Sequence, residues 1–169
     1  TICARAGVSP GLLRHYFEGI DDLIAATYRD VTDRVAATLR SAEEEAGTDS
    51  RARLLAFVTA SFRPPIADPA LLATWLAFWS LVKTRPVIAS IHGETYRSYR
   101  EELELLLAGC GLAAHEAAPV AIALTALVDG LWLELSLDPS TLTPADATAM
   151  AVRGVDTLLE RASFGWNLL

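Results

Sequence analysis

Hydrophobic and polar residues follow a helical period along most of the chain. Two apolar stripes recur at spacings of three and four residues: Leu72, Trp75, Trp79 and Val82 in one, and Ile88, Ile91, Thr95, Tyr99 and Leu106 in the other. No segment shows the strict alternation that is typical of a β-strand. The pattern predicts a short helix that ends near Ala6, helices over 10–16, 20–45, 50–63, 69–83, 86–108, 116–137 and 144–162, and therefore an all-α fold.

Several of these helices begin with a recognisable capping sequence. Ser9-Pro10, Asp68-Pro69 and Thr143-Pro144 each place a side-chain oxygen just before a proline at the first helical position. Acidic residues near helix starts are favoured by the helix dipole. The capping sequences therefore support the boundaries that the hydrophobic pattern predicts.

The segment 116–137 is apolar nearly all round, so it needs packing partners on more than one side. Asp129 and Glu134 lie inside it and would be costly in a membrane, which favours a helix buried in a soluble protein. One partner is its own core, and the second is a copy of the chain, with 144–162 completing a four-helix interface. The predicted dimer interface comprises Leu124, Leu127, Val128, Leu131, Val152, Val155 and Leu159. Gly130 within this helix suggests a close approach of another helix.

Composition indicates an ordered protein with a sizeable core, because 52% of the 169 residues are hydrophobic. Cys3 and Cys110 form no disulfide framework, which favours a reducing cytoplasm. The net charge of −7 is unusual for a nucleic-acid binder, although Arg5 and Arg14 are the only charged residues before Glu18. The chain starts without Met and within a helical pattern, so we expect its true start to lie upstream.

The segment ICARAGVSPGLLRHYF has the pattern of a helix-turn-helix. A helix ends in Ala-Gly, and Gly7 allows the left-handed turn. Val8 is an apolar residue within the turn, and Ser9-Pro10 starts a second helix. In a DNA reader this second helix enters the major groove. The predicted DNA-contacting residues are Ser9, Pro10, Gly11, Arg14, His15 and Tyr16. By spacing alone, an ordinary tight corner between two helices explains the pattern somewhat better, and the resemblance described next favours the DNA reader.

Three motifs resemble one family of regulators. AGVSPGLLRHYF, followed by the acidic helix start DDLIAATY, resembles the second half of the DNA-binding domain of TetR-family transcriptional regulators. ATWLAFWS at 73–80 and ALVDGLWLE at 126–134 resemble the sensor domain of the BetI-like branch, the choline-responsive repressors of betaine synthesis. The resemblance covers essentially the whole chain. It implies a partial helix-turn-helix domain with a linker helix at 1–46 and a TetR-like ligand-sensing and dimerisation domain at 47–169.

The chain departs from the family pattern in two places. The first helix of the family's DNA-binding domain and the start of its second are not present, so we expect the chain as given to bind DNA poorly. Glu18-Gly19-Ile20 stands where the family usually has basic residues, which removes phosphate contacts and adds repulsion.

Aromatic side chains concentrate on three of the predicted helices. Such rings can surround a quaternary ammonium through cation–π attraction, and a nearby carboxylate adds complementary charge. The predicted ligand-binding residues are Trp75, Phe78, Trp79, Tyr96, Tyr99, Asp129 and Trp132. Aromatic stripes of this kind also commonly form the core, and Asp129 could serve a structural pairing as well as a ligand. A choline-like effector follows from the resemblance only.

Catalysis is not expected, because the three histidines lie on different predicted helices and no nucleophile or phosphate-loop motif is present. No cofactor or metal is expected either. The sequence therefore predicts a cytoplasmic, homodimeric repressor that a small molecule releases from operator DNA. The alternative is a helical dimeric ligand-binding or interaction module without DNA-binding activity.

Overall fold

The computed structural model describes residues 2–163, and these form an all-α protein, as predicted. Its helices are α1 (Ile2–Ala6), α2 (Pro10–Tyr16), α3 (Ile20–Glu45), α4 (Ser50–Ala60), α5 (Pro69–Val82), α6 (Pro86–Gly109), α7 (Ala114–Leu137) and α8 (Pro144–Ser163). Most boundaries lie within two residues of the prediction. Helix α4 is three residues shorter, since Pro64 and Pro65 follow it, and proline disfavours a helix in the residues before it. The last six residues of the predicted sensor domain, 164–169, lie outside the described residues.

The predicted capping sequences start their helices. The Ser9 hydroxyl accepts a hydrogen bond from the Leu12 amide at 3.1 Å. The Asp68 carboxylate accepts from the amides of two residues of α5. Thr143 and Asp146 cap reciprocally, each side chain accepting from the other's backbone amide. These local hydrogen bonds satisfy backbone donors that a helix leaves open, which is why the boundaries follow from the sequence.

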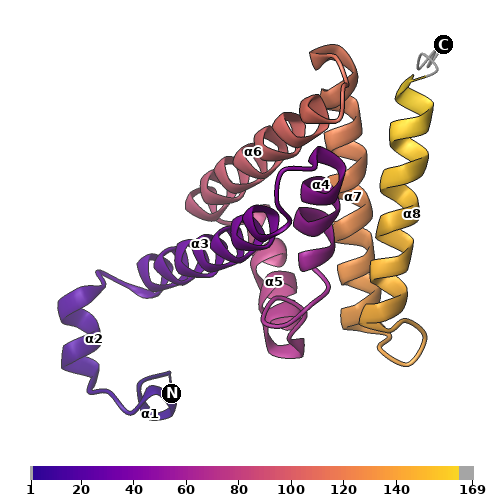
Figure 1. Cartoon of the computed structure of the whole chain (residues 1–169). Helices are drawn as coiled ribbons and strands as arrows, with labels where there is room; N and C mark the ends of the chain where they lie inside the picture. The colour runs from indigo at the N-terminus through magenta and orange to yellow at the C-terminus, as the bar shows by residue number, and fades with distance from the viewer. Residues whose placement is uncertain (1, 164–169) are drawn as a thin grey trace.

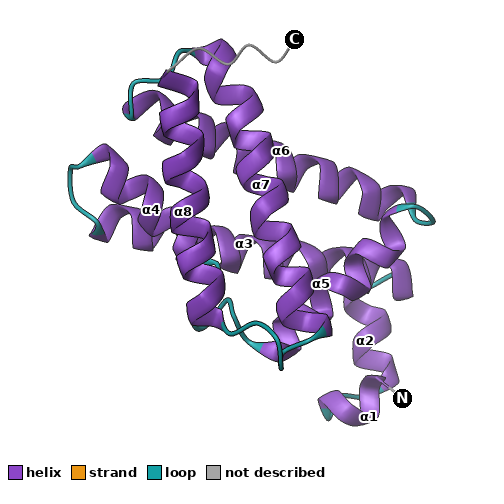
Figure 2. Ribbon diagram, turned by 90° about the vertical axis from the view of Figure 1, so that its right-hand side faces the viewer, coloured by secondary structure: helices purple, strands orange, loops and turns teal. Residues whose placement is uncertain are grey.

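Helices α3 to α8 form the body of the protein, whereas α1 and α2 project from it at the start of α3 (Figure 1). Helix α3 packs on α4 and α6, and α7 packs on α5, α6 and α8. The view turned by 90° shows the same projection beyond the helical body (Figure 2). The 26-residue helix α3 is thus the direct connection between the projection and the body.

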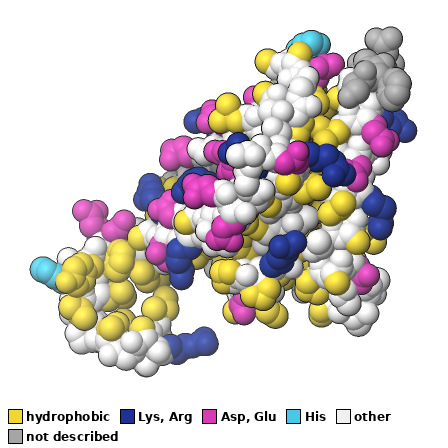
Figure 3. Space-filling view, in the orientation of Figure 1, with side chains coloured by type: hydrophobic (Ala, Val, Ile, Leu, Met, Phe, Trp, Pro, Cys, Tyr) yellow, Lys and Arg dark blue, Asp and Glu magenta, His cyan; other side chains and the backbone are white. Residues whose placement is uncertain are grey.

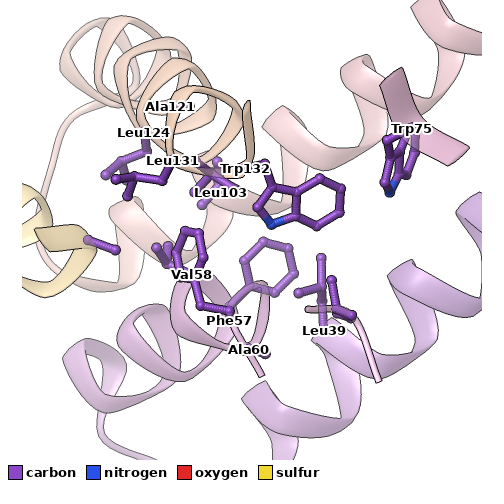
Figure 4. Close-up of a cluster of buried hydrophobic side chains, with 14 of the residues drawn as sticks. Leu39, Phe57, Val58, Ala60, Trp75, Leu103, Ala121, Leu124, Leu131 and Trp132 are labelled. Atoms are coloured by element: carbon purple, nitrogen blue, oxygen red, sulfur yellow. The ribbon is translucent and has the colours of Figure 1, made fainter. Parts of the chain in front are cut away.

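Helix α7 is long and apolar enough to cross a membrane by length and composition. Its buried side chains, among them Val120, Leu124 and Leu131, instead join a core that all the body helices share. In the close-up of this core, Trp132 of α7 extends toward the side where Leu39 of α3 lies, with Trp75 of α5 beyond it (Figure 4). Helix α7 therefore occupies the central position that its apolar composition predicts.

Candidate functional site

The body contains a cavity of about 460 Å³ bounded by α3, α4, α5, α6 and α7. Five of the seven predicted ligand-binding residues line it: Trp75, Tyr96, Tyr99, Asp129 and Trp132. Phe78 and Trp79 are not among its lining residues. Phe78 is buried and stacks on Tyr28, with ring centroids 4.2 Å apart, so it belongs to the packed core.

Asp129 is the carboxylate that lies deepest among the aromatic residues of the cavity. Its Oδ1 accepts a hydrogen bond of 3.0 Å from the Tyr96 hydroxyl, so this acidic residue has the partner that its burial requires. Burial raises the pKa of Asp129 to about 6, while the Tyr96 hydrogen bond and the positive charge of Arg100 act in the opposite direction. The carboxylate is therefore ionised at neutral pH, at a cost that a bound cation would offset.

The rings around Asp129 come from four helices, α4, α5, α6 and α7. Trp75 and Trp132 lie 5.7 Å apart between centroids, and Phe57 stacks on Tyr99 at 5.4 Å. The Trp132 indole donates a 3.0 Å hydrogen bond to the Ser61 carbonyl, which fixes the ring against the end of α4. The cavity thus combines a negative charge with aromatic surfaces held in place by their neighbours.

Tyr28 of α3 and His92 of α6 were not predicted as functional residues, yet they join these two helices of the cavity wall. Tyr28 is fully buried, and its hydroxyl is hydrogen-bonded to His92 Nδ1 at 3.1 Å. The His92 ring packs on Tyr96 at 4.2 Å between centroids, and burial lowers the pKa of His92. His92 is therefore a packed histidine that takes part in the helix contact. The apolar face of α3, on which Tyr28 lies with Ala25 and Val31, was the available sequence signal.

The projecting helices have the geometry of the predicted turn. Gly7 has a positive φ of 66°, and the Val8 amide donates to the Cys3 carbonyl across the turn. All six predicted DNA-contacting residues of the second helix and its cap are exposed: Ser9, Pro10, Gly11, Arg14, His15 and Tyr16. Figure 3 shows hydrophobic side chains gathered on this projection, with a histidine at its outer edge.

Residues 50–160 match the family described as BetI-type transcriptional repressor, C-terminal. The chain belongs to the TetR family, in its BetI-type branch. It is 34% identical over 168 residues to the HTH-type transcriptional regulator BetI 2 of Chromohalobacter salexigens, covering 94% of this chain and 76% of that protein. It is 35% identical over 161 residues to BetI of Burkholderia mallei, covering 94% and 81%.

Solved structures support the same assignment. A regulator from Pseudomonas aeruginosa PAO1 is 43% identical, with a TM-score of 0.85 over 94% of this chain and 78% of that one. A transcriptional regulator from Rhodococcus is 28% identical, with a TM-score of 0.84 over 95% and 84%. The protein is thus a ligand-responsive, DNA-binding transcriptional regulator and not an enzyme, and the module without DNA-binding activity has no support. TetR-family regulators bind operator DNA, form dimers and respond to small-molecule effectors.

The predicted dimer interface of this TetR-family chain needs correction on α7. Leu124, Val128 and Leu131 are at most 8% exposed within one subunit, and Val155 of α8 is fully buried. These four side chains are core residues rather than interface residues, because a partner subunit could not reach them. The half-buried Leu127 packs inside the subunit as well: a Cβ added at Gly154 would lie 2.4 Å from its Cδ2.

The remaining predicted interface residues, Val152 and Leu159, lie on the flank of α8 that faces α4. Asp156 shares this flank and pairs with Arg51 of α4. Within one subunit the close helix approach occurs at Gly154, whereas a Cβ at Gly130 would have no atom within 4 Å. A close approach of a second subunit's helix at Gly130 stays a prediction. Gly130 lies on the exposed face of α7.

Proposed function

We propose that this regulator is a cytoplasmic repressor that leaves its operator when an organic cation binds at Asp129. The cation's ammonium group, quaternary as in choline, would lie against the carboxylate and the faces of the surrounding rings. The observation that carries the proposal is the Asp129 carboxylate, half-buried among aromatic side chains and hydrogen-bonded to the Tyr96 hydroxyl, whereas the lining acids Asp33 and Glu94 are exposed.

The charge and the rings favour a cation over a neutral ligand. The carboxylate has lost much of its hydration, as the raised pKa of Asp129 reflects, so its attraction for a cation is less screened than at the surface. A desolvated cation–π contact adds about 2 kcal/mol. A purely structural role for Asp129 would leave a charge buried beside Tyr96 without a direct ion pair, which is costly.

Helix α3 would carry the signal from the cavity to the DNA reader. It supplies cavity residues between Arg29 and Arg40, and its first turn leads directly into α2. Two contacts tie it to α6: the hydrogen bond between Tyr28 and His92, and an ion pair between Asp21 and Arg85. An effector that binds one arrangement of α3 and α6 more tightly than the other shifts the equilibrium by that difference in affinity.

The DNA-reading role falls to the exposed residues of α2. In a dimer, the two copies of this helix would lie about 34–36 Å apart to enter successive major grooves. Arg14 is the best placed for a base edge or a phosphate, since its guanidinium suits both. An effector-induced change in this spacing would release the operator.

We further propose that the dimer forms through the outward face of α7 and the neighbouring flank of α8. Exposed apolar residues recur along that face at helical spacing: Ile122, Ala126, Leu133 and Leu137. Met150 is 41% exposed, and it lies one turn before Gly154 on the flank of α8 that meets α7. This stripe takes the place of the buried residues that were predicted.

The test uses the full-length regulator and a palindromic fragment from its own promoter. Fluorescence anisotropy should show binding that choline weakens, whereas its neutral analogue, with tert-butyl in place of trimethylammonium, should not. Asp129→Asn should bind the fragment normally and lose the choline response, and Glu101→Gln, an exposed acid on α6, should keep it. Equal effects of the charged and neutral compounds would contradict the proposal.

A further inference from the structure

The cavity is much larger than a choline-sized ligand. Even at roughly 30 Å³ for each non-hydrogen atom, the share of a water molecule in the liquid, choline takes up about 210 Å³. The cavity measures about 460 Å³. Binding sites commonly enclose most of their ligand's surface, so choline would leave much of this cavity to water against apolar walls.

The extra space extends along α3 and α6. Asp21 pairs with Arg85 and Tyr28 with His92, each pair separated by 64 residues, so the two helices run parallel and in register. Cavity residues on α6 extend from Ile91 to Glu102, a span of about 16 Å at 1.5 Å per residue. The cavity is therefore elongated along the two helices.

Asp129 is not at the end of this cavity but beside Tyr96. From Tyr96 to Glu102, α6 rises about another 9 Å. Beside the polar Asp33, Ser98 and Thr125, apolar and aromatic side chains from α3, α4, α6 and α7 line the cavity along this stretch: Val35, Ala36, Leu39, Phe57, Tyr99 and Val128. It has room and surface for an apolar group attached to the cation.

The far end of this stretch is polar. Arg40 of α3 and Glu102 of α6 line the cavity there, and Arg40 is exposed to solvent. These opposite charges offset each other and favour no net charge on the ligand's distal end. We propose that the effector is an amphipathic monocation larger than choline, with its ammonium at Asp129 and its apolar part along Leu39 and Tyr99. This inference rests on the proposed cation site.

A homologous series of ligands tests the apolar part separately from the charge. Isothermal titration of the full-length regulator would compare choline with butyl-, hexyl- and octyltrimethylammonium, all below their micellar concentrations. Affinity should rise about fourfold for each added methylene until the stretch is filled, since each buried methylene removes apolar surface from water. Octyltrimethylammonium binding no tighter than choline would overturn the inference.

Two variants separate this inference from the cation site itself. Ala36→Phe fills the apolar stretch and should weaken octyltrimethylammonium at least tenfold with little effect on choline, whereas Ala37→Phe, on the exposed side of the same helix, should weaken neither. Asp129→Asn should weaken all members of the series by a similar factor. Dependence on charge without dependence on length refutes the amphipathic effector alone. Dependence on length without dependence on charge refutes the cation site.

Discussion

Tyr28 of α3 and His92 of α6 share a 3.1 Å hydrogen bond between the tyrosine hydroxyl and Nδ1 of the imidazole. The bond joins the helix that carries the DNA reader to the helix that carries Tyr96, the partner of Asp129. A change at Asp129 can thus reach α3 through Tyr96 and His92, which are in direct contact.

Replacing Tyr28 by Phe removes this bond while keeping the buried ring. We expect effector affinity and DNA affinity, measured separately, to change less than threefold. The factor by which the effector weakens DNA binding should fall about fivefold, since one hydrogen bond contributes about 1 kcal/mol to the coupling. Thr38→Ala is the control, because that hydroxyl bonds only within α3. An unchanged coupling factor in the Tyr28 variant would assign the bond to stability alone.

The pKa of Asp129, raised to about 6, predicts a pH dependence of cation binding. A proton competes with the cation for the carboxylate, so affinity should be constant above pH 7 and fall by up to tenfold per unit below about pH 6. Isothermal titration calorimetry between pH 5 and 8 measures this pH dependence of the cation affinity. Asp129→Asn should give a flat profile. If the wild-type profile is also flat, the cation does not bind at this carboxylate.

Asp129 should also affect folding stability with a definite sign. Its pKa in the folded state is above the ordinary value of 3.8, so the folded protein binds this proton more tightly and loses stability as pH rises from about 4 through 6. The shift corresponds to about 3 kcal/mol. Asp129→Asn keeps an acceptor for Tyr96 and should be more stable than wild type at pH 7.5 but not at pH 4. Urea unfolding at both pH values measures the difference in stability between the variant and the wild type. A difference that is the same at pH 4 and pH 7.5 would mean that the ionisation of Asp129 does not cause it.

Arg14→Ala in the full-length regulator should weaken operator binding. A lost base contact costs about 1–3 kcal/mol, and a lost phosphate contact lowers the slope of log affinity against log salt by about 1. Anisotropy titrations at several salt concentrations distinguish the two. Arg34→Ala is matched in charge but lies on α3, paired with Asp30. Equal losses in both variants would mean that only overall charge matters.

Two substitutions on α7 separate the dimer interface from the core. Ile122 is 55% exposed on the outward face, so Ile122→Glu should yield folded monomers by light scattering. Leu127→Glu should instead lower the thermal midpoint, because Leu127 packs on Gly154 within the subunit. Leu105→Glu, on the exposed face of α6, should change neither property. If the Ile122→Glu variant still dimerises as tightly as the wild type, the interface lies elsewhere.

The sequence predicted the helices well because their ends depend on local chemistry. Ser9 caps α2 and Asp68 caps α5 through side chains that reach their own helix, so neighbouring residues contain the information. The exposed second helix of the helix-turn-helix follows from the same kind of local pattern, with Gly7 at the turn. The sequence predicted only part of the cavity lining. Aromatic stripes indicate which faces of the helices are buried, but they do not distinguish rings that line a cavity from rings that pack in the core.

By itself, the sequence determined the all-α class, the helix boundaries and the family, since capping, periodicity and motifs act over short stretches of chain. Only the tertiary structure decided which apolar residues of α7 face inward: Leu124 and Ile122 lie on opposite sides of a helix that is hydrophobic all round, and its composition cannot distinguish them. The contact between Tyr28 and His92 likewise spans 64 residues. Such pairings depend on how helices pack, and packing is a property of the whole fold.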